Sequence, residues 1–284
     1  MSKKSQILSI YCTFAHLIEA LMITNLKTSI EAAIAGGKAI MEVYATEFEV
    51  EIKGDDSPLT MADQNANAII NTFLVPTEIP IISEENKQTD YKDRSHWSRC
   101  WIVDPLDGTK EFVKRNGEFT VNIALVQDGT PILGVIYVPV SKTLYFTSED
   151  AAKSFKIVLE DEDISVDNIL KNASEIKPAE ESEPVKVVGS RSHLNDDTKA
   201  FISEIEKNKT VEIVSKGSSL KFCLVAEGDA HLYPRFAPTM EWDTAAGHAI
   251  CTAAGVQVID QNTQQPLQYN KENLLNPYFL VTRI

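Results

Sequence analysis

Residues 101–112 read Trp-Ile-Val-Asp-Pro-Leu-Asp-Gly-Thr-Lys-Glu-Phe, and this stretch decides the fold. Its first apolar residues predict a buried strand with Asp104 at the end, where Pro105 lacks the backbone N–H needed to continue. Asp104 and Asp107 then face each other across a tight turn, with Cα atoms within about 7 Å. The Gly-Thr pair that follows begins a helix whose free N–H groups would face a bound anion.

Two carboxylates at this spacing repel each other unless a cation lies between them, and hard oxygen ligands of this kind suit Mg²⁺. The segment therefore predicts a combined metal and phosphate site. Most Asp-x-x-Asp strings are instead Asx-type turns with solvated acids, and the spacing alone leaves both interpretations open.

Upstream of this segment, apolar residues at helical spacing predict an amphipathic helix over residues 25–45. Its Gly36-Gly37 pair weakens the helix by about 1 kcal/mol per glycine, which indicates close packing against a neighbour. The other elements predicted in this half are a strand with one wet face at 48–52, a helix from Thr60 to about Phe73 and buried strands at 79–83 and 100–104.

Downstream, three apolar runs predict an antiparallel meander at 119–126, 132–138 and 144–147. Residues 149–183 are acidic and weakly periodic, so we expect an exposed excursion or an interdomain connection there. Beyond Pro184 strand and helix patterns alternate, which is typical of an α/β arrangement.

The pattern predicts two lobes, α+β followed by α/β. Residues 22–150 form the metal-binding lobe with an antiparallel sheet, and residues 151–284 form the lobe with the ligand pocket. Residues 1–21 are expected to be a non-essential extension. Their apolar run loosely resembles a signal peptide, but His16 and Glu19 interrupt it, and it is too short and polar to span a bilayer.

Charge and cysteine content restrict the partners. The 284 residues carry 27 Lys and Arg against 41 Asp and Glu, a formal charge of −14. Nucleic acid is excluded as a bulk partner, because phosphate backbones are bound by clustered basic residues. The four cysteines are far apart and form no CxxC pair, which favours buried, reduced thiols in a cytoplasmic protein.

Three further acidic strings could complete the site. Ser83-Glu84-Glu85 follows an apolar run, although a Glu-Glu pair is usually a charged loop. Thr60-x-x-Asp63 fits a helix capping box, which is the structural alternative for Asp63. Asp243 stands at the start of a predicted helix, where it could serve only as an N-cap.

Taken together, these strings resemble the lithium-sensitive, magnesium-dependent phosphatases related to inositol monophosphatase. The matching strings are Ser57–Asp63, Ser83-Glu84-Glu85, Asp104-Pro-Leu-Asp107-Gly-Thr109 and Trp242-Asp243-Thr-Ala-Ala-Gly247. Their order and spacing agree from about residue 25 to the end of the chain. The resemblance implies a two-lobed, layered αβαβα sandwich of the inositol-monophosphatase/fructose-bisphosphatase type.

Other strings resemble the bacterial 3′(2′),5′-bisphosphate nucleotidase branch of that family. They are Lys110-Glu111-Phe112, Ser190-Arg191-Ser192-His193, Gly217-Ser218-Ser219-Leu220-Lys221-Phe222 and Leu232-Tyr233-Pro234-Arg235. The resemblance implies hydrolysis of the 3′-phosphate of adenosine 3′,5′-bisphosphate to AMP, in sulfate assimilation and nucleotide recycling. A protein of charge −14 needs local cations for the second phosphate, and the basic residues of these strings could supply them or could be solvated surface bases.

The resemblance also implies roles for individual residues. Mg²⁺ would be held by Glu84, Asp104, the carbonyl of Leu106, Asp107 and Asp243. Asp63 and Thr109, with Glu84, would be catalytic, Thr109 being oriented by Asp63 to accept a proton from the attacking water. Substrate would contact Leu106, Asp107, Gly108, Thr109, Ser218, Lys221, Arg235 and Asp243.

Two alternatives remain at this point. Within enzymes, the chain could be an inositol monophosphatase or sugar-phosphate phosphatase of the same superfamily. Outside enzymes, the acidic cluster could belong to a regulator that binds a divalent cation or phosphorylated metabolite without turnover. The expected partner is a small phosphorylated nucleotide, for a monomer or homodimer in the cytoplasm with at most weak peripheral contact with the inner membrane.

Overall fold

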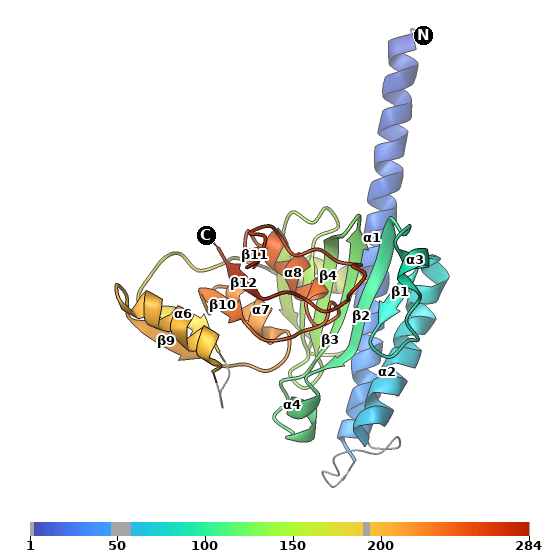
Figure 1. Cartoon of the computed structure of the whole chain (residues 1–284). Coiled ribbons are helices and arrows are strands. Elements are labelled where there is room, and N and C mark those ends of the chain that lie inside the picture. The colour runs from blue at the N-terminus through green and yellow to red at the C-terminus, as the bar shows by residue number, and fades with distance from the viewer. Residues whose placement is uncertain (1–2, 47–57, 190–193, 284) are drawn as a thin grey trace.

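The computed structural model, which describes residues 3–46, 58–189 and 194–283, stacks two β-sheets between three helical layers (Figure 1). The first sheet follows chain order: β1 (Ile81–Ser83), β2 (Arg99–Asp107), β3 (Thr120–Gln127), β4 (Thr130–Val138), β5 (Thr143–Thr147), β6 (Ser154–Val158) and β7 (Ser174–Ile176). Only the β1–β2 pair in this sheet is parallel.

The second sheet has the order β11-β12-β10-β8-β9. Its strands are β8 (Val185–Val188), β9 (Val211–Val214), β10 (Leu232–Arg235), β11 (Gln257–Asp260) and β12 (Phe279–Thr282). The α-helices among the described residues are α1 (Lys3–Tyr44), α2 (Pro58–Leu74), α3 (Tyr91–Arg94), α4 (Thr109–Val113), α5 (Val166–Asn172), α6 (Asp196–Glu206), α7 (Leu220–Ala226) and α8 (Ala245–Ala253). A short 3₁₀ turn, Val75–Thr77, follows α2.

Three apolar cores separate the layers and confirm the predicted αβαβα order. One core joins α1 and α2 to the outer face of the first sheet. The largest lies between the two sheets, where it takes in α7 and α8, and a small third core lies between α6 and the second sheet. Both sheets thus share the central core, in which α8 packs against β3 and β4 of the first sheet.

The outer helices fit closely, as the Gly36-Gly37 pair predicted. A Cβ atom at Gly36 would lie 2.9 Å from the Ile70 side chain of α2, and one at Gly37 would lie 2.5 Å from Tyr137 of β4. The predicted helix at 25–45 is confirmed but begins earlier, at Lys3, and its first turns project from the body (Figure 1). Among described side chains, Met22 is the first to be buried, so residues 1–21 remain our proposed non-essential extension.

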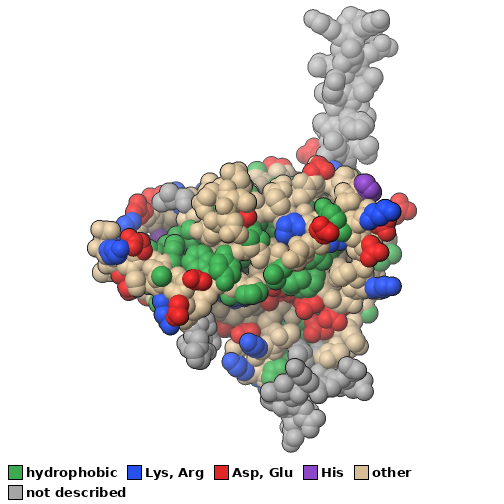
Figure 2. Space-filling model, viewed as in Figure 1, with side chains coloured by type: hydrophobic (Ala, Val, Ile, Leu, Met, Phe, Trp, Pro, Cys, Tyr) green, Lys and Arg blue, Asp and Glu red, His purple; other side chains and the backbone are tan. Residues whose placement is uncertain are grey.

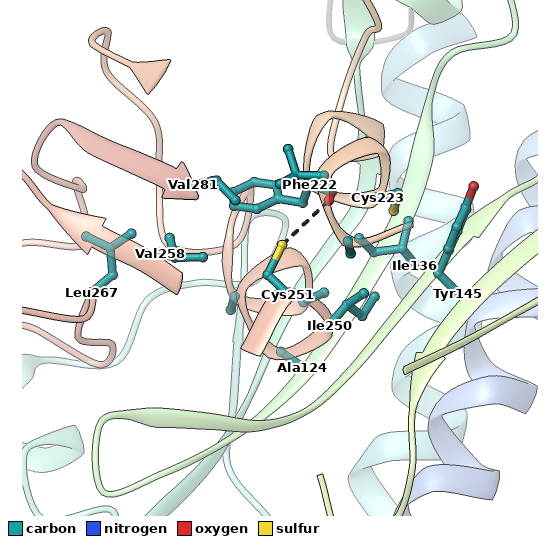
Figure 3. Packing of buried hydrophobic residues seen from close by; sticks show 14 of the residues in the cluster. Ala124, Ile136, Tyr145, Phe222, Cys223, Ile250, Cys251, Val258, Leu267 and Val281 are labelled. Carbon is teal, nitrogen blue, oxygen red and sulfur yellow. Dashed lines mark hydrogen bonds between the residues drawn. The ribbon is translucent and has the colours of Figure 1, made fainter. Parts of the chain in front are cut away.

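The central layer consists of α7 and α8 packed between the sheets. Figure 3 shows side chains from both helices and both sheets pointing toward one another around Cys251, whose thiol donates to the carbonyl oxygen of Phe222 at 3.5 Å. Cys100, Cys223 and Cys251 are free and buried, which confirms the expectation of reduced thiols for these three.

The sequence prediction for the end of β2 was wrong. Pro105 does not end β2, which runs to Asp107. Between the pairs Asp104↔Asn122 and Asp107↔Thr120, β2 advances three residues and β3 two, so the missing N–H of Pro105 falls in a β-bulge. The bulge interrupts the regular alternation of side chains between the two faces of the sheet, and so changes the direction in which the acidic side chains of β2 point.

The acidic stretch 149–183 is not an excursion, because β6 and β7 extend the first sheet and α5 lies between them. Its acids are surface groups that partly pair with α1, as in Lys38–Asp163 at 2.6 Å. Sheet membership places residues 151–176 with the first sheet. The division into lobes stays a proposal, with its boundary moved past Ile176.

The predicted strand at 48–52 lies outside the described residues. No helix in the described part of the chain is long and apolar enough to cross a membrane.

Candidate active site

Three acidic side chains from separate segments meet at one edge of the first sheet. The parallel register Ser83↔Val103 places the next residues side by side, Glu84 directly after β1 and Asp104 within β2. Asp243, in the turn before α8, joins them through the shared core. One carboxylate oxygen from each of the three lies within 4.8 Å of the other two.

Burial and mutual repulsion raise the pKa values of these acids. Asp104 is 1% exposed, and burial, followed by the charges of Asp107, Glu84 and Asp243, raises its pKa well above the ordinary value. Burial and the charge of Asp107 raise the pKa of Asp243 to about 7. Burial and the charge of Glu85 raise that of Glu84 to about 7. The cluster therefore holds protons near neutral pH that a divalent cation would displace.

The donor set fits a hard divalent cation. It offers carboxylate oxygens only, and Mg²⁺ prefers oxygen ligands from one or two carboxylates together with water and phosphate. Met240 N–H donates to Oδ2 of Asp243 at 2.8 Å, and Leu106 N–H donates to Oδ1 of Asp104 at 3.1 Å. These contacts fix the orientation of both carboxylates, and neither carboxylate forms a salt bridge among the described groups, although the positive charge of Arg235 acts to lower the pKa of Asp243.

Asp107 lies beside this cluster but outside its 4.8 Å limit. Its Oδ2 accepts hydrogen bonds from the hydroxyls of Ser218 at 2.7 Å and Ser219 at 2.8 Å, and a longer one from Asn122 Nδ2 at 3.4 Å. The predicted acids therefore gather in one place, while their role as metal ligands remains a prediction.

Asp63 and Thr109 are placed differently. Asp63 is buried in α2, where burial and the charges of Glu85 and Glu84 raise its pKa to about 8. Thr109 is exposed at the first turn of α4. The two share no hydrogen bond among the described side chains, so their action as a proton-accepting pair also stays a prediction.

Two structural alternatives are wrong. The helix containing Asp63 begins at Pro58, so Thr60 lies within it and is not its N-cap. The N-cap of α8 is Thr244, so Asp243 is not the cap but the residue before it.

Gly108 precedes α4 in a left-handed conformation, with φ of 98°. A Cβ atom there would lie 3.1 Å from Cβ of Ser218 and 3.2 Å from the carbonyl oxygen of Glu118. Both the backbone conformation and the space therefore require glycine, and this allows β2 and the turn before α7 to approach each other closely.

A pocket of about 470 Å³ opens beside Asp107 and contains the predicted substrate residues Gly108, Ser218, Lys221 and Arg235. Figure 2 shows acidic and basic side chains gathered in the lower middle of one face of the molecule. Among the described groups, neither Lys221 nor Arg235 has an acidic ion-pair partner, and Nε of Arg235 is buried without a hydrogen-bond acceptor. Burial lowers the pKa of Lys221. Cations placed in this way are suited to an anionic ligand.

The sequence prediction missed three other lysines of this pocket, Lys110 on α4, Lys114 directly after it and Lys216 before α7. Lys110 belongs to the string Lys110-Glu111-Phe112, and Lys114 follows that string closely. Two lysines so near each other in an acidic chain were the sequence signal that could have identified them. Arg191 and His193, which were expected nearby, lie outside the described residues.

The fold and the acidic site define a member of a phosphatase family. The chain belongs to the inositol monophosphatase family, whose sequence profile matches residues 23–280, and this confirms the predicted resemblance. It is 47% identical over 250 residues to the 3′(2′),5′-bisphosphate nucleotidase CysQ of Salmonella typhimurium strain LT2, covering 87% of this chain and 94% of that protein.

Other relatives have the same name or share the fold. Identity to the 3′(2′),5′-bisphosphate nucleotidase CysQ of Escherichia coli K12 is 46% over 251 residues, covering 87% of this chain and 94% of that protein. The crystal structure of CysQ from Bacteroides thetaiotaomicron superimposes with a TM-score of 0.84 at 49% identity, covering 91% of this chain and 96% of that one. An inositol monophosphatase from Zymomonas mobilis, 20% identical with a TM-score of 0.68 and covering 91% and 92% of the two chains, shares the fold.

Proposed function

We propose that this chain hydrolyses the 3′-phosphate of adenosine 3′,5′-bisphosphate to AMP and phosphate, in sulfate assimilation and nucleotide recycling. One observation carries the proposal: the acidic cluster adjoins a pocket in which Lys221 and Arg235 have no acidic partner among the described groups. A substrate with two phosphates matches both the acidic cluster and the adjoining basic pocket, because one phosphate reacts at the acids while the other is held by the cations. The names of relatives that are 46–49% identical support the same activity.

The acids of the site would hold Mg²⁺. Its ligands would be Glu84, Asp104, Asp107, Asp243 and the carbonyl of Leu106. When bound, Mg²⁺ supplies Lewis-acid stabilisation of the charge on the transferred phosphoryl group.

The protein's own groups do the remaining work. Lys221 and Arg235 bind the phosphate that is not cleaved and thereby orient the nucleotide. The backbone at Gly108 and Thr109 would donate to the transferred phosphoryl oxygens. Asp63 would orient Thr109, and Thr109 would accept the proton released from the attacking water.

The cytoplasmic location and quaternary state are also proposals. The free thiols of Cys100, Cys223 and Cys251 support a reducing compartment. A monomer or homodimer with weak peripheral membrane contact follows only from the resemblance.

A substrate panel tests the proposed activity. We expect kcat/KM for adenosine 3′,5′-bisphosphate to exceed that for inositol 1-phosphate by about 30-fold or more, because a lost contact to a buried charge costs at least about 2 kcal/mol. Phosphate release is measured with millimolar Mg²⁺, with and without lithium. Fructose 1,6-bisphosphate is the control for two phosphates without a nucleoside.

The outcomes distinguish the proposed nucleotidase from an inositol or sugar phosphatase and from a regulator without turnover. Equal rates for inositol 1-phosphate and the nucleotide contradict the substrate assignment and favour a general inositol or sugar phosphatase. Absence of phosphate release from all three compounds contradicts catalysis and favours a cation-binding or metabolite-binding regulator.

A further inference from the structure

Three donors converge on one oxygen of Asp107. Oδ2 accepts from Ser218, Ser219 and Asn122, whereas the other oxygen, Oδ1, accepts no hydrogen bond among the described groups. The two oxygens of this carboxylate thus have different surroundings. One is hydrogen-bonded to the protein, and the other has no hydrogen-bond partner among the described groups.

Ser219 is central to this arrangement. Its side chain is buried, and its hydroxyl accepts from Asn122 Nδ2 at 2.9 Å. The same hydroxyl lies 2.8 Å from Oδ2 of Asp107 and 2.7 Å from the carbonyl oxygen of Asp243. Because a hydroxyl has one proton, it can donate to only one of these acceptors at a time, and a carboxylate oxygen is a stronger acceptor than a backbone carbonyl.

The partners of Ser219 are themselves fixed. Oδ1 of Asn122 accepts from the hydroxyl of Thr120 at 2.9 Å, which orients the amide so that its N–H points to Ser219. Thr120 and Asn122 are both buried in β3. The network therefore connects the first sheet to the turns before α7 and α8, which carry the serines and Asp243.

Backbone strain marks the same turn. Ser218 has φ of +53°, a left-handed conformation that costs a non-glycine residue free energy. This conformation brings the Ser218 hydroxyl to Asp107 at 2.7 Å and to Thr120 at 2.5 Å. A glycine would adopt this conformation more easily but would lose both contacts. The two contacts of the Ser218 hydroxyl therefore offset the conformational cost at this position.

We propose that Ser219 is a positioning residue for the cation site. It commits Oδ2 of Asp107 to the protein and leaves Oδ1 as the single atom that this residue offers to a divalent cation. The inference rests on the proposed function only in taking Asp107 as a cation ligand.

The Ser219→Ala variant tests this role by thermal unfolding in increasing Mg²⁺, without nucleotide. Loss of an outer hydrogen-bond partner of a ligand typically weakens metal affinity by about 10- to 100-fold, so we expect the apparent Kd for Mg²⁺ to rise by that factor. At saturating Mg²⁺ the KM for the nucleotide should stay unchanged, because Ser219 does not line the substrate pocket.

Ser154→Ala is the matched control. The Ser154 hydroxyl is also buried and donates to the carbonyl oxygen of Ile250 at 2.7 Å, but it lies in β6, outside the network around Asp107. It should lower the unfolding midpoint without changing the apparent Kd. A wild-type Kd in Ser219→Ala, or an equal rise in both variants, overturns the proposal.

Thr120→Val keeps the test decisive if Ser219→Ala does not fold. It preserves side-chain volume but removes the hydroxyl that orients Asn122, so a severalfold rise in the apparent Kd supports the proposal and an unchanged value overturns it. Mg²⁺ binding is measured without substrate. A failed substrate panel therefore contradicts the activity and not the role of Ser219, and an unchanged Kd contradicts only the latter.

Discussion

We expect the Asp104→Asn variant to lose about 10³-fold or more in turnover while its metal-free form becomes more resistant to heat at pH 8. The activity falls because the variant replaces a charged ligand at the centre of the cluster. A cation supplies several kcal/mol of charge stabilisation, and about 1.4 kcal/mol corresponds to a factor of ten. The fold should persist, because Oδ1 of the amide can still accept from Leu106 N–H.

The gain in stability follows from the sign of the pKa shift. Burial and the neighbouring acids raise the folded-state pKa of Asp104 above its unfolded value. Its contribution to stability is therefore fully present below the unfolded pKa, about 4, and is lost as pH rises through the folded pKa. The metal-free wild type should be less stable at pH 8 than at pH 5, and Asp104→Asn should lose less over this range.

Unfolding midpoints in EDTA at pH 5 and pH 8, together with phosphate release in Mg²⁺, measure both effects. Each kcal/mol of repulsion removed should raise the midpoint by about 2–4 °C. Asp163→Asn is the control, because Asp163 is an exposed acid paired with Lys38 far from the cluster. Turnover near the wild-type value in Asp104→Asn would remove this residue from the site.

The second large effect is expected from Lys221→Met. The KM for adenosine 3′,5′-bisphosphate should rise by about 30-fold or more, because removing one partner of a buried charge pair costs at least about 2 kcal/mol. Turnover of inositol 1-phosphate should not change, since this substrate has no second phosphate. The free protein should not be destabilised, because burial already lowers the pKa of Lys221 and its ammonium group forms no salt bridge among the described residues, only a hydrogen bond to the carbonyl oxygen of Ser218 and longer-range attraction to Asp107.

Steady-state kinetics on the two substrates check this prediction. Lys209→Met is the control, since Lys209 pairs with Glu181 at the surface and lies outside the substrate pocket. An equal loss with both substrates in Lys221→Met would mean that Lys221 does not bind the second phosphate.

Local sequence signals predicted much of the fold. The helical spacing at 25–45 and the meander at 119–147 are patterns that burial of one face imposes. Glu84 and Asp104 could be placed together because short apolar runs before them predicted two buried strands. Gly36 and Gly37 indicated the close approach of α1 to α2 and β4.

Features set by distant contacts were not predictable from local signals. The extent of β2 depends on a bulge against β3, so Pro105 alone gave the wrong end. The acids of the stretch 149–183 are exposed, as predicted, but the pairing of β6 with β5 and of β7 with β6, which makes the stretch part of the first sheet, had no local signal. Asp243 had only a helix-start signal, and its position beside Asp104 required the family resemblance.

The residues of the pocket likewise divide into those that local sequence signals identified and those that only distant contacts bring together. Lys221 and Arg235 were found through quoted strings, whereas Lys110, Lys114 and Lys216 became pocket residues only because α4 and the turn before α7 face each other. The hydrogen bonds of Ser219 have no sequence signature, since serine hydroxyls commonly serve turns.

We propose that Glu84, Asp104 and Asp243 form one divalent-cation site next to Asp107. A crystal grown with Mn²⁺ in place of Mg²⁺ tests it most directly, through the anomalous signal of the metal. We predict a strong peak within about 2.3 Å of carboxylate oxygens from these three residues. A crystal in which Mn²⁺ binds elsewhere, or in which the three carboxylates remain without a peak at millimolar Mn²⁺ and neutral pH, would contradict it.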